Sequence, residues 1–304
     1  LFAGQGQLGG FFGHVHEDLA GIPTSRHEAA CASGSIAILA ASAEIEAGRY
    51  GLALVLGIEL MRNVPGQRAA EYLGSAAWAG REAQEARYLW PFMFSNVAAE
   101  YEERFGLDRA HLRGISEINF SNAKKNPNSQ TRGWKTDAPF FSDDDEANPP
   151  IEGSLRKADC GQVTDGAAAI FLASSEVAER YAKRRGITLE SIPRIKGWGH
   201  ATAPLLYSTK VNASRGQPYV FPSVRKAMMD ALGRAGMVSP LVLDRHGELL
   251  RAFAAADGSW RLPVELDRLD PLFVRMLLAY EDKRFHDHAG VDPLALLRAA
   301  GQLL

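Results

Sequence analysis

The sequence predicts an α/β fold, and three segments carry that prediction. Residues 33–47 are rich in alanine, isoleucine and leucine, which is typical of a mostly buried helix. Residues 52–58 (LALVLGI) form a short continuous apolar run, which predicts a strand that is covered on both faces. An apolar strand pattern returns at residues 167–173, and a helix follows at 176–185, where Gly186 closes it.

The first helix stands between two strand patterns. The short segment 26–30 precedes it and could form a strand, and the apolar run 52–58 follows it. Strand, helix and strand in such close succession make a βαβ unit, which is usually part of a parallel sheet. We therefore expect parallel pairing in this part of the chain.

Residues 62–160 have a different texture. Helical patterns occur only in places, such as 95–105, and much of the remainder is polar, including 119–134 and the acidic run 143–146. We interpret this segment as a long excursion from the sheet, and such excursions in compact domains are usually functional or mobile. The acidic run itself is expected to be a solvated loop.

Two further elements follow the second strand and helix. Residues 192–198 could start another strand. Ser223 is expected to cap a helix whose apolar positions share one face and which ends at Gly236.

The texture changes again after that helix. Residues 241–244 and 248–253 predict a β-hairpin. Asp270 and Pro271 predict a helix cap followed by a first-turn proline. These patterns predict that residues 237–304 form a small α+β fragment.

The composition excludes several classes of protein. The formal net charge is -2, so the composition does not show the excess of basic residues that is typical of nucleic-acid-binding proteins. The two cysteines, Cys31 and Cys160, are too few for a disulfide framework and fit a reducing compartment, so we expect a cytoplasmic location. No apolar window is long enough to span a membrane, and no secretory leader is present. The chain begins with Leu1 rather than Met, so we expect it to start inside a longer gene product.

Cys31 is the candidate nucleophile. It stands between a strand-like segment and the start of the alanine-rich helix, where backbone N–H groups and the helix dipole favour an anionic sulfur. The small residues Ser33 and Gly34 let a substrate approach the sulfur. The alternative interpretation of the same residues is a small buried thiol in an alanine-rich turn.

The segment around Cys31 also carries a family resemblance. The stretch HEAACASGS at residues 27–35 closely resembles the nucleophile segment of thiolases, in particular the branch of sterol-carrier-protein-like thiolases and acetyl-CoA acetyltransferases. Further landmarks follow in the family's order: Gly48-Arg49-Tyr50, Gly57-Ile58-Glu59-Leu60-Met61, Ser121-Asn122-Ala123, Asn126-Pro127, Asp159-Cys160 and Thr164-Asp165-Gly166-Ala167. The resemblance implies that residues 1–236 form an incomplete thiolase-like layered αβα fold with a long loop domain.

The resemblance implies a chemistry as well. In thiolases the cysteine that matches Cys31 takes an acyl group from an acyl-CoA, and a second acyl-CoA then attacks the thioester as a carbanion. That cycle needs a base for the thiol, an oxyanion hole and a second acid–base group. The resemblance also implies that a coenzyme A thioester is the substrate and the binding partner. It implies no bound cofactor, and it assigns no cofactor-binding residue in this sequence. Thiolases form dimers or dimers of dimers, so a homodimer is one arrangement open to this chain.

Parts of the thiolase pattern are missing from the sequence. The family's Gly-His-Pro histidine and its second cysteine in a Cys-x-Gly motif do not occur, and Cys160 lies before the place expected for that cysteine. The strand, helix and strand with which the family opens should precede Leu1. We therefore expect slow acylation of Cys31 at best and no complete Claisen cycle. The alternative is a non-catalytic thiolase-like protein that binds acyl-CoA or a protein partner.

Residues 237–304 resemble a different family, the start of the glycosyltransferase domain of bifunctional penicillin-binding proteins of the 1C type. The residues that carry this resemblance are Leu243-Asp244-Arg245, Trp260-Arg261-Leu262-Pro263, Glu281-Asp282-Lys283-Arg284-Phe285, His288, Gly290, Asp292 and Arg298-Ala299. In that family the glutamate matching Glu281 is the catalytic base, although a charged helix end explains the same residues. A fragment of a peptidoglycan glycosyltransferase is thus a second alternative function. The join would be a gene fusion or an artefact of sequence assembly.

Histidine pairs suggest a metal site only weakly. His14 and His16 are separated by one residue, as are His286 and His288, a spacing that could place two ligands on one face of a strand. No carboxylate or thiol cluster accompanies either pair, so we expect no metal site.

Overall fold

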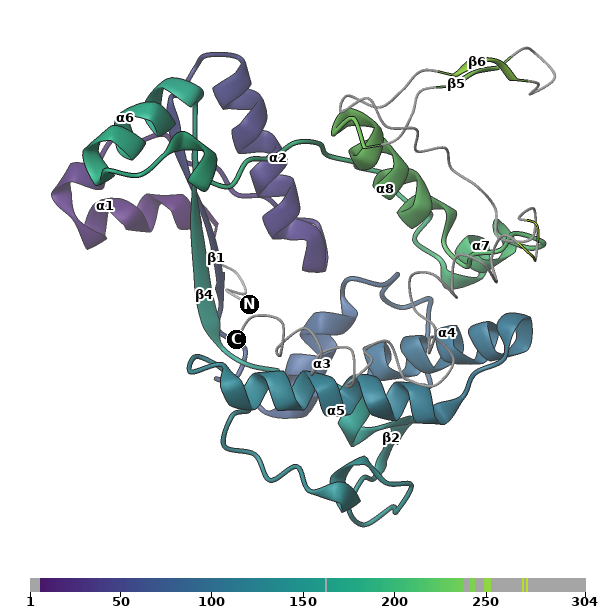
Figure 1. The fold of residues 1–304 in the computed structure, drawn as a ribbon. Coiled ribbons are helices and arrows are strands. Elements are labelled where there is room, and N and C mark those ends of the chain that lie inside the picture. The colour runs from purple at the N-terminus through teal and green to yellow at the C-terminus, as the bar shows by residue number, and fades with distance from the viewer. Residues whose placement is uncertain are drawn as a thin grey trace, which may run out of the picture.

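The computed structural model describes residues 6–161 and 163–237, the backbone of 241–243 and 249–252, and residues 270 and 272. Helices and small sheets are mixed, which is compatible with the predicted α/β class (Figure 1). The helices are α1 (Phe12–Val15), α2 (Ser33–Glu46), α3 (Gly66–Gly74), α4 (Leu89–Phe105), α5 (Arg109–Lys125), α6 (Ser175–Arg185), α7 (Tyr207–Asn212) and α8 (Pro222–Arg234). The strands are β1 (Leu52–Glu59), β2 (Pro150–Glu152), β3 (Leu155–Arg156), β4 (Gly166–Ala173), β5 (Leu241–Leu243) and β6 (Leu249–Ala252).

The main sheet of the described residues is a long two-stranded ribbon of β1 and β4 (Figure 1). The strands run antiparallel, with Leu52 opposite Ala173 and Glu59 opposite Gly166, so the prediction of parallel pairing is wrong here. The segment 26–30, predicted as a strand, has no strand structure and leads into a 3₁₀ turn. A strand forms only where a neighbouring edge accepts its backbone hydrogen bonds, and β1 pairs with β4 alone within the described part.

Other elements cover the β1–β4 ribbon less completely than the sequence predicted. Helix α2 packs against β1 and β4, yet no side chain of α2, which is described along its whole length, is fully buried. Leu54 of β1 lies opposite Phe171 of β4, so both project from the same face, and Phe171 is 69% exposed. The expectations of a mostly buried helix and of a strand covered on both faces are therefore wrong for this structure.

Residues 62–160 are more regular than expected. Helix α5 begins after Asp108, whose carboxylate accepts the N–H of Ala110 at 2.8 Å, and continues to Lys125. It therefore takes up the first part of 119–134, which was predicted as polar loop. Phe120 packs edge-on against Phe140 with ring centroids 5.1 Å apart, and Phe140 is buried. Phe120 also stacks on the Trp134 ring, so a small aromatic core lies under this helix.

The second helix of the α/β pattern is confirmed with both of its ends. The Ser174 hydroxyl accepts the N–H of Val177 at 3.3 Å, and Gly186 closes α6 at a φ of 65°. Residues 192–198 are not a strand.

Two glycines explain why that stretch takes another form. A Cβ at Gly197 or Gly199 would overlap the carbonyl oxygens of Ala231 and Ala227 on α8. The chain therefore packs backbone to backbone against α8 instead of pairing in a sheet. The Arg234 guanidinium lies 4.0 Å from the centroid of the Trp198 ring and closes the contact.

Helix α8 begins two residues earlier than predicted. Phe221 is its N-cap and Pro222 its first residue, so Ser223 lies inside the first turn and does not cap it. Proline suits that position because its fixed φ is helical and its missing N–H has no intrahelical acceptor there.

Arg104 joins α4 to the chain around α7. Its guanidinium donates to the carbonyl oxygen of Val211 at 3.2 Å and to both the carbonyl and the hydroxyl of Ser214 at 3.0 Å. It also pairs with Glu100 one turn earlier. The side chain is only 14% exposed, and Ser214 is fully buried. Arg104 therefore organises this region.

The C-terminal part is described in pieces. Strands β5 and β6 pair antiparallel, which confirms the predicted hairpin. The Asp270 carboxylate accepts the N–H of Leu272 at 2.7 Å, as expected of a cap before Pro271. Glu281 lies outside the described residues, and so do His286 and His288. Within the described part, no helix combines the length and the apolar character that crossing a membrane requires.

Candidate functional site

Cys31 lies in a tight turn at the start of α2. The 3₁₀ turn Ala30–Ala32 leads directly into the helix, and Cys31 is exposed. Ala30 has a φ of 48°, a left-handed conformation that costs a residue with a Cβ on the order of 1–2 kcal/mol. Backbone strain of this kind concentrates at functional sites, because only a constrained local structure maintains it.

Side chains on both sides of the cysteine hold that turn. The hydroxyl of Ser33 accepts the N–H of Ala29 at 2.9 Å and donates to the carbonyl of Ala30 at 2.6 Å. The carboxylate of Glu28 accepts the N–H of Ala30 at 2.7 Å. The turn therefore presents the sulfur of Cys31 at the positive end of the α2 dipole.

The thiol of Cys31 has no partner side chain among the residues that the structure describes. Among the described residues, no hydrogen bond or ion pair joins Cys31 to a histidine or a carboxylate. The imidazole of His27 hydrogen-bonds with the hydroxyl of Ser25 at 3.0 Å. The site thus presents an exposed thiol, and within the described part no base is assembled beside it.

Cys160 has a contrasting environment. It is half-buried, and burial raises the pKa of its thiol, with the negative charge of Asp159 as the second cause. Both effects favour the neutral thiol. The half-buried position agrees with the expectation of a buried or semi-buried thiol at Cys160.

Two landmarks of the resemblance meet at one end of the β1–β4 ribbon. Ile58 and Glu59 pair with Ala167 and Gly166. One oxygen of the Asp165 carboxylate accepts the N–H groups of both Met61 and Arg62, each at 2.7 Å. Asp165 therefore fixes the exit of β1, a role that its sequence position did not reveal.

Of the histidine pairs considered as metal ligands, His16 has a described contact with its own turn. The imidazole of His16 accepts the N–H of Asp18 at 3.2 Å and so caps a short turn. In the part of the chain that the structure describes, no group of three potential ligands gathers.

The C-terminal part of the chain matches a known family. The family described as Transglycosylase matches residues 246–304. Penicillin-binding protein 1C of Escherichia coli is 42% identical over 62 residues, which are 20% of this chain and 8% of that protein.

The N-terminal part is similar to different proteins. The acetyl-CoA acetyltransferase of Methanothermobacter thermautotrophicus is 31% identical over 166 residues, 55% of this chain and 41% of the relative. Sterol carrier protein 2 of Oryctolagus cuniculus is 27% identical over 171 residues, 54% of this chain and 30% of the relative. The chain thus spans less than half the length of these relatives.

Both resemblances predicted from the sequence are confirmed. Thiolase-type relatives cover the N-terminal part, and penicillin-binding relatives and the transglycosylase family match the C-terminal part, as expected of a chimera. The domain boundary between residues 236 and 237 stays a prediction, as do the roles of Cys31 and Glu281. A thiolase-like layering of the fold is not established by the mixed helices and small sheets.

Proposed function

We propose that the N-terminal part takes an acyl group from an acyl-CoA thioester onto Cys31 and does not complete a carbon–carbon condensation. The observation that supports this most directly is the exposed Cys31 in a strained, side-chain-held turn at the start of α2. Its position in the segment similar to thiolases supplies the substrate class.

The proposed step is a thioester exchange. The Cys31 sulfur, having released its proton to solvent, attacks the carbonyl carbon of the acyl-CoA. The oxyanion that forms would lie at the N-terminal end of α2, where the positive end of the helix dipole favours negative charge. The bond from the carbonyl carbon to the coenzyme A sulfur then breaks, and coenzyme A leaves as a thiolate that takes a proton from solvent.

Incubation with acetyl-CoA followed by intact mass spectrometry tests this proposal. We expect the slow gain of one acetyl group, its loss in Cys31→Ala and its retention in Cys160→Ala, the matched control. An acetyl group that persists in Cys31→Ala would overturn the assignment. Release of acetoacetyl-CoA above the level of the Cys31→Ala variant would overturn the incomplete cycle. Acyl-CoA binding without any acetylation would favour the non-catalytic alternative.

The C-terminal part supports a second candidate function, because the transglycosylase family matches residues 246–304. We propose that Glu281 corresponds to the base of peptidoglycan glycosyl transfer and that this segment alone does not polymerise glycan. Incubation of the purified protein with lipid II tests this, and any glycan product above that of Glu281→Gln would contradict it.

Assembly and location belong to the same proposal. A homodimer and a cytoplasmic location stay predictions of the thiolase resemblance and of the cysteine content. Light scattering of the purified chain would check the first, and fractionation of the source cells the second.

A further inference from the structure

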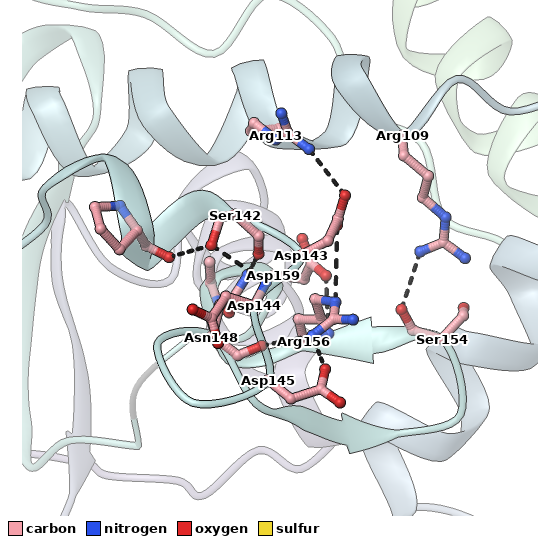
Figure 2. Close-up of polar contacts among 12 residues, drawn as sticks. Arg109, Arg113, Ser142, Asp143, Asp144, Asp145, Asn148, Ser154, Arg156 and Asp159 are labelled. Carbon is pink, nitrogen blue, oxygen red and sulfur yellow. Dashed lines mark hydrogen bonds and ion pairs between the residues drawn. The ribbon is translucent and has the colours of Figure 1, made fainter.

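A second site lies away from Cys31, between α5 and the β2–β3 hairpin. It is a cavity of about 360 Å³, and three arginines from two elements line it. Arg109 and Arg113 come from α5, one turn apart, and Arg156 comes from β3. Figure 2 shows the three guanidinium groups around one region, with the acidic segment 143–145 beside them.

One carboxylate lies between two of these arginines. Asp143 pairs with Arg113 at 3.2 Å through one oxygen and with Arg156 at 3.9 Å through the other. The Asp143 side chain is 75% exposed. Ion pairs this exposed contribute little to stability, so Asp143 can leave at small cost.

The third arginine has spare donors. Arg109 donates to the carbonyl oxygen of Ser154 at 2.9 Å, and within the described residues no carboxylate pairs with it. Of the acidic residues that line the cavity, Asp159 is engaged with the backbone N–H of Arg156 at 2.9 Å. Arg156 also pairs with Asp145 beside the cavity, at 2.7 Å. Arg109 is therefore the lining arginine that no carboxylate pairs with among the described residues.

The wall behind these groups is held in place. Asn148 is 4% exposed and uses both ends of its side chain, donating to the carbonyl of Ser142 and accepting the N–H of Ala158, each at 2.9 Å. The buried hydroxyl of Ser116 on α5 donates to the carbonyl of Ala158 at 2.9 Å. The hairpin is therefore fixed to α5, and the arginines start from a preorganised frame.

We propose that this cavity binds a diphosphate-type anion, which takes the place of the Asp143 carboxylate between Arg113 and Arg156 and engages the spare donors of Arg109. Guanidinium groups bind phosphate oxygens through pairs of parallel hydrogen bonds, and two or more of them suit a ligand with several anionic oxygens. In the absence of the anion, the Asp143 carboxylate lies where one phosphate group of the anion would bind. The proposal does not use Cys31 and is independent of the acyl-transfer function.

Calorimetric titration of the full chain with sodium pyrophosphate, against sodium chloride at matched ionic strength, tests the proposal. We expect saturable binding, weakened about tenfold in Arg109→Gln and in Arg113→Gln, since each loses charged hydrogen bonds to the anion. Asp143→Asn is expected to bind more tightly, because the competing charge is gone. Arg180→Gln, which removes an exposed pair with Glu176 on α6, is the matched control and should bind as the parent chain does.

The direction of the Asp143→Asn effect separates a binding site from a structural ion-pair network. A network would lose thermal stability in that variant without any gain in affinity for pyrophosphate. A parallel titration with ADP distinguishes a nucleotide-borne diphosphate, which would bind more tightly than pyrophosphate, from a free one. Absence of saturable binding by both probes, or equal weakening in Arg109→Gln and Arg180→Gln, would overturn the proposal.

Discussion

Replacement of Ser33 by alanine should slow the reaction of Cys31 without unfolding the protein. The Ser33 hydroxyl makes two hydrogen bonds to the backbone of the turn, at 2.9 Å to Ala29 and at 2.6 Å from its own proton to Ala30. Without them, only the Glu28 carboxylate still holds Ala30, which can relax more readily from its φ of 48° to an unstrained conformation.

The size of this effect follows from those two bonds. A typical hydrogen bond contributes about 0.5–1.5 kcal/mol net, and the turn is partly exposed, so we estimate a loss of about 1–2 kcal/mol. If that loss acts on the population of turns that present the sulfur correctly, the acylation rate falls roughly tenfold. The global unfolding temperature should change little, because the affected bonds are local.

The assay is the rate of acetylation of Cys31 by acetyl-CoA, followed by mass spectrometry. Ser35→Ala is the matched control, because Ser35 lies in the same helical turn and its hydroxyl makes no hydrogen bond among the described residues. Equal rates for the two variants would refute the argument that the Ser33 bonds hold the nucleophile in place.

Three further changes test the fold around the site. Gly199→Ala places a Cβ against a carbonyl oxygen of α8 and should cost about 3 kcal/mol in the free energy of unfolding, whereas Gly133→Ala, at an open position, should cost little. Because burial raises the pKa of Cys160, iodoacetamide at mildly alkaline pH should alkylate it more slowly than the exposed Cys31; equal rates in the folded protein would contradict this. The raised pKa also means that any stability contributed by the protonated thiol is lost as the pH rises above the ordinary thiol pKa. Arg104→Met removes the donors to the α7 region and leaves a half-buried carboxylate unpaired, so denaturant titration should show a loss of roughly 3 kcal/mol.

Local patterns were enough to predict the elements that carry their own signals. The helix α6 has a serine cap and a closing glycine, and α2 and β1 have long apolar patterns, so their positions could be read from the sequence. Strand pairing could not, because β1 and β4 are joined by about a hundred residues, and their antiparallel direction depends on how that segment returns.

The sequence pointed to Cys31 as the candidate residue, but it did not reveal the side chains that hold the turn around it. Cys31 stands out by its place before a helix. The roles of Glu28, Ser33 and the left-handed Ala30 depend on a turn geometry that no residue type dictates. The acidic run 143–146 is exposed as predicted, yet Asp143 bridges two arginines that are distant in the sequence, which only the folded chain brings together.

The most direct test of the account locates the acyl group itself. The full chain is incubated with acetyl-CoA, digested, and mapped by tandem mass spectrometry under conditions that preserve thioesters. We expect acetylation on the sulfur of Cys31, released by hydroxylamine, with Cys160 unmodified. Acetylation confined to lysines, or spread equally over both cysteines, would contradict the claim that this turn presents a nucleophile to acyl-CoA.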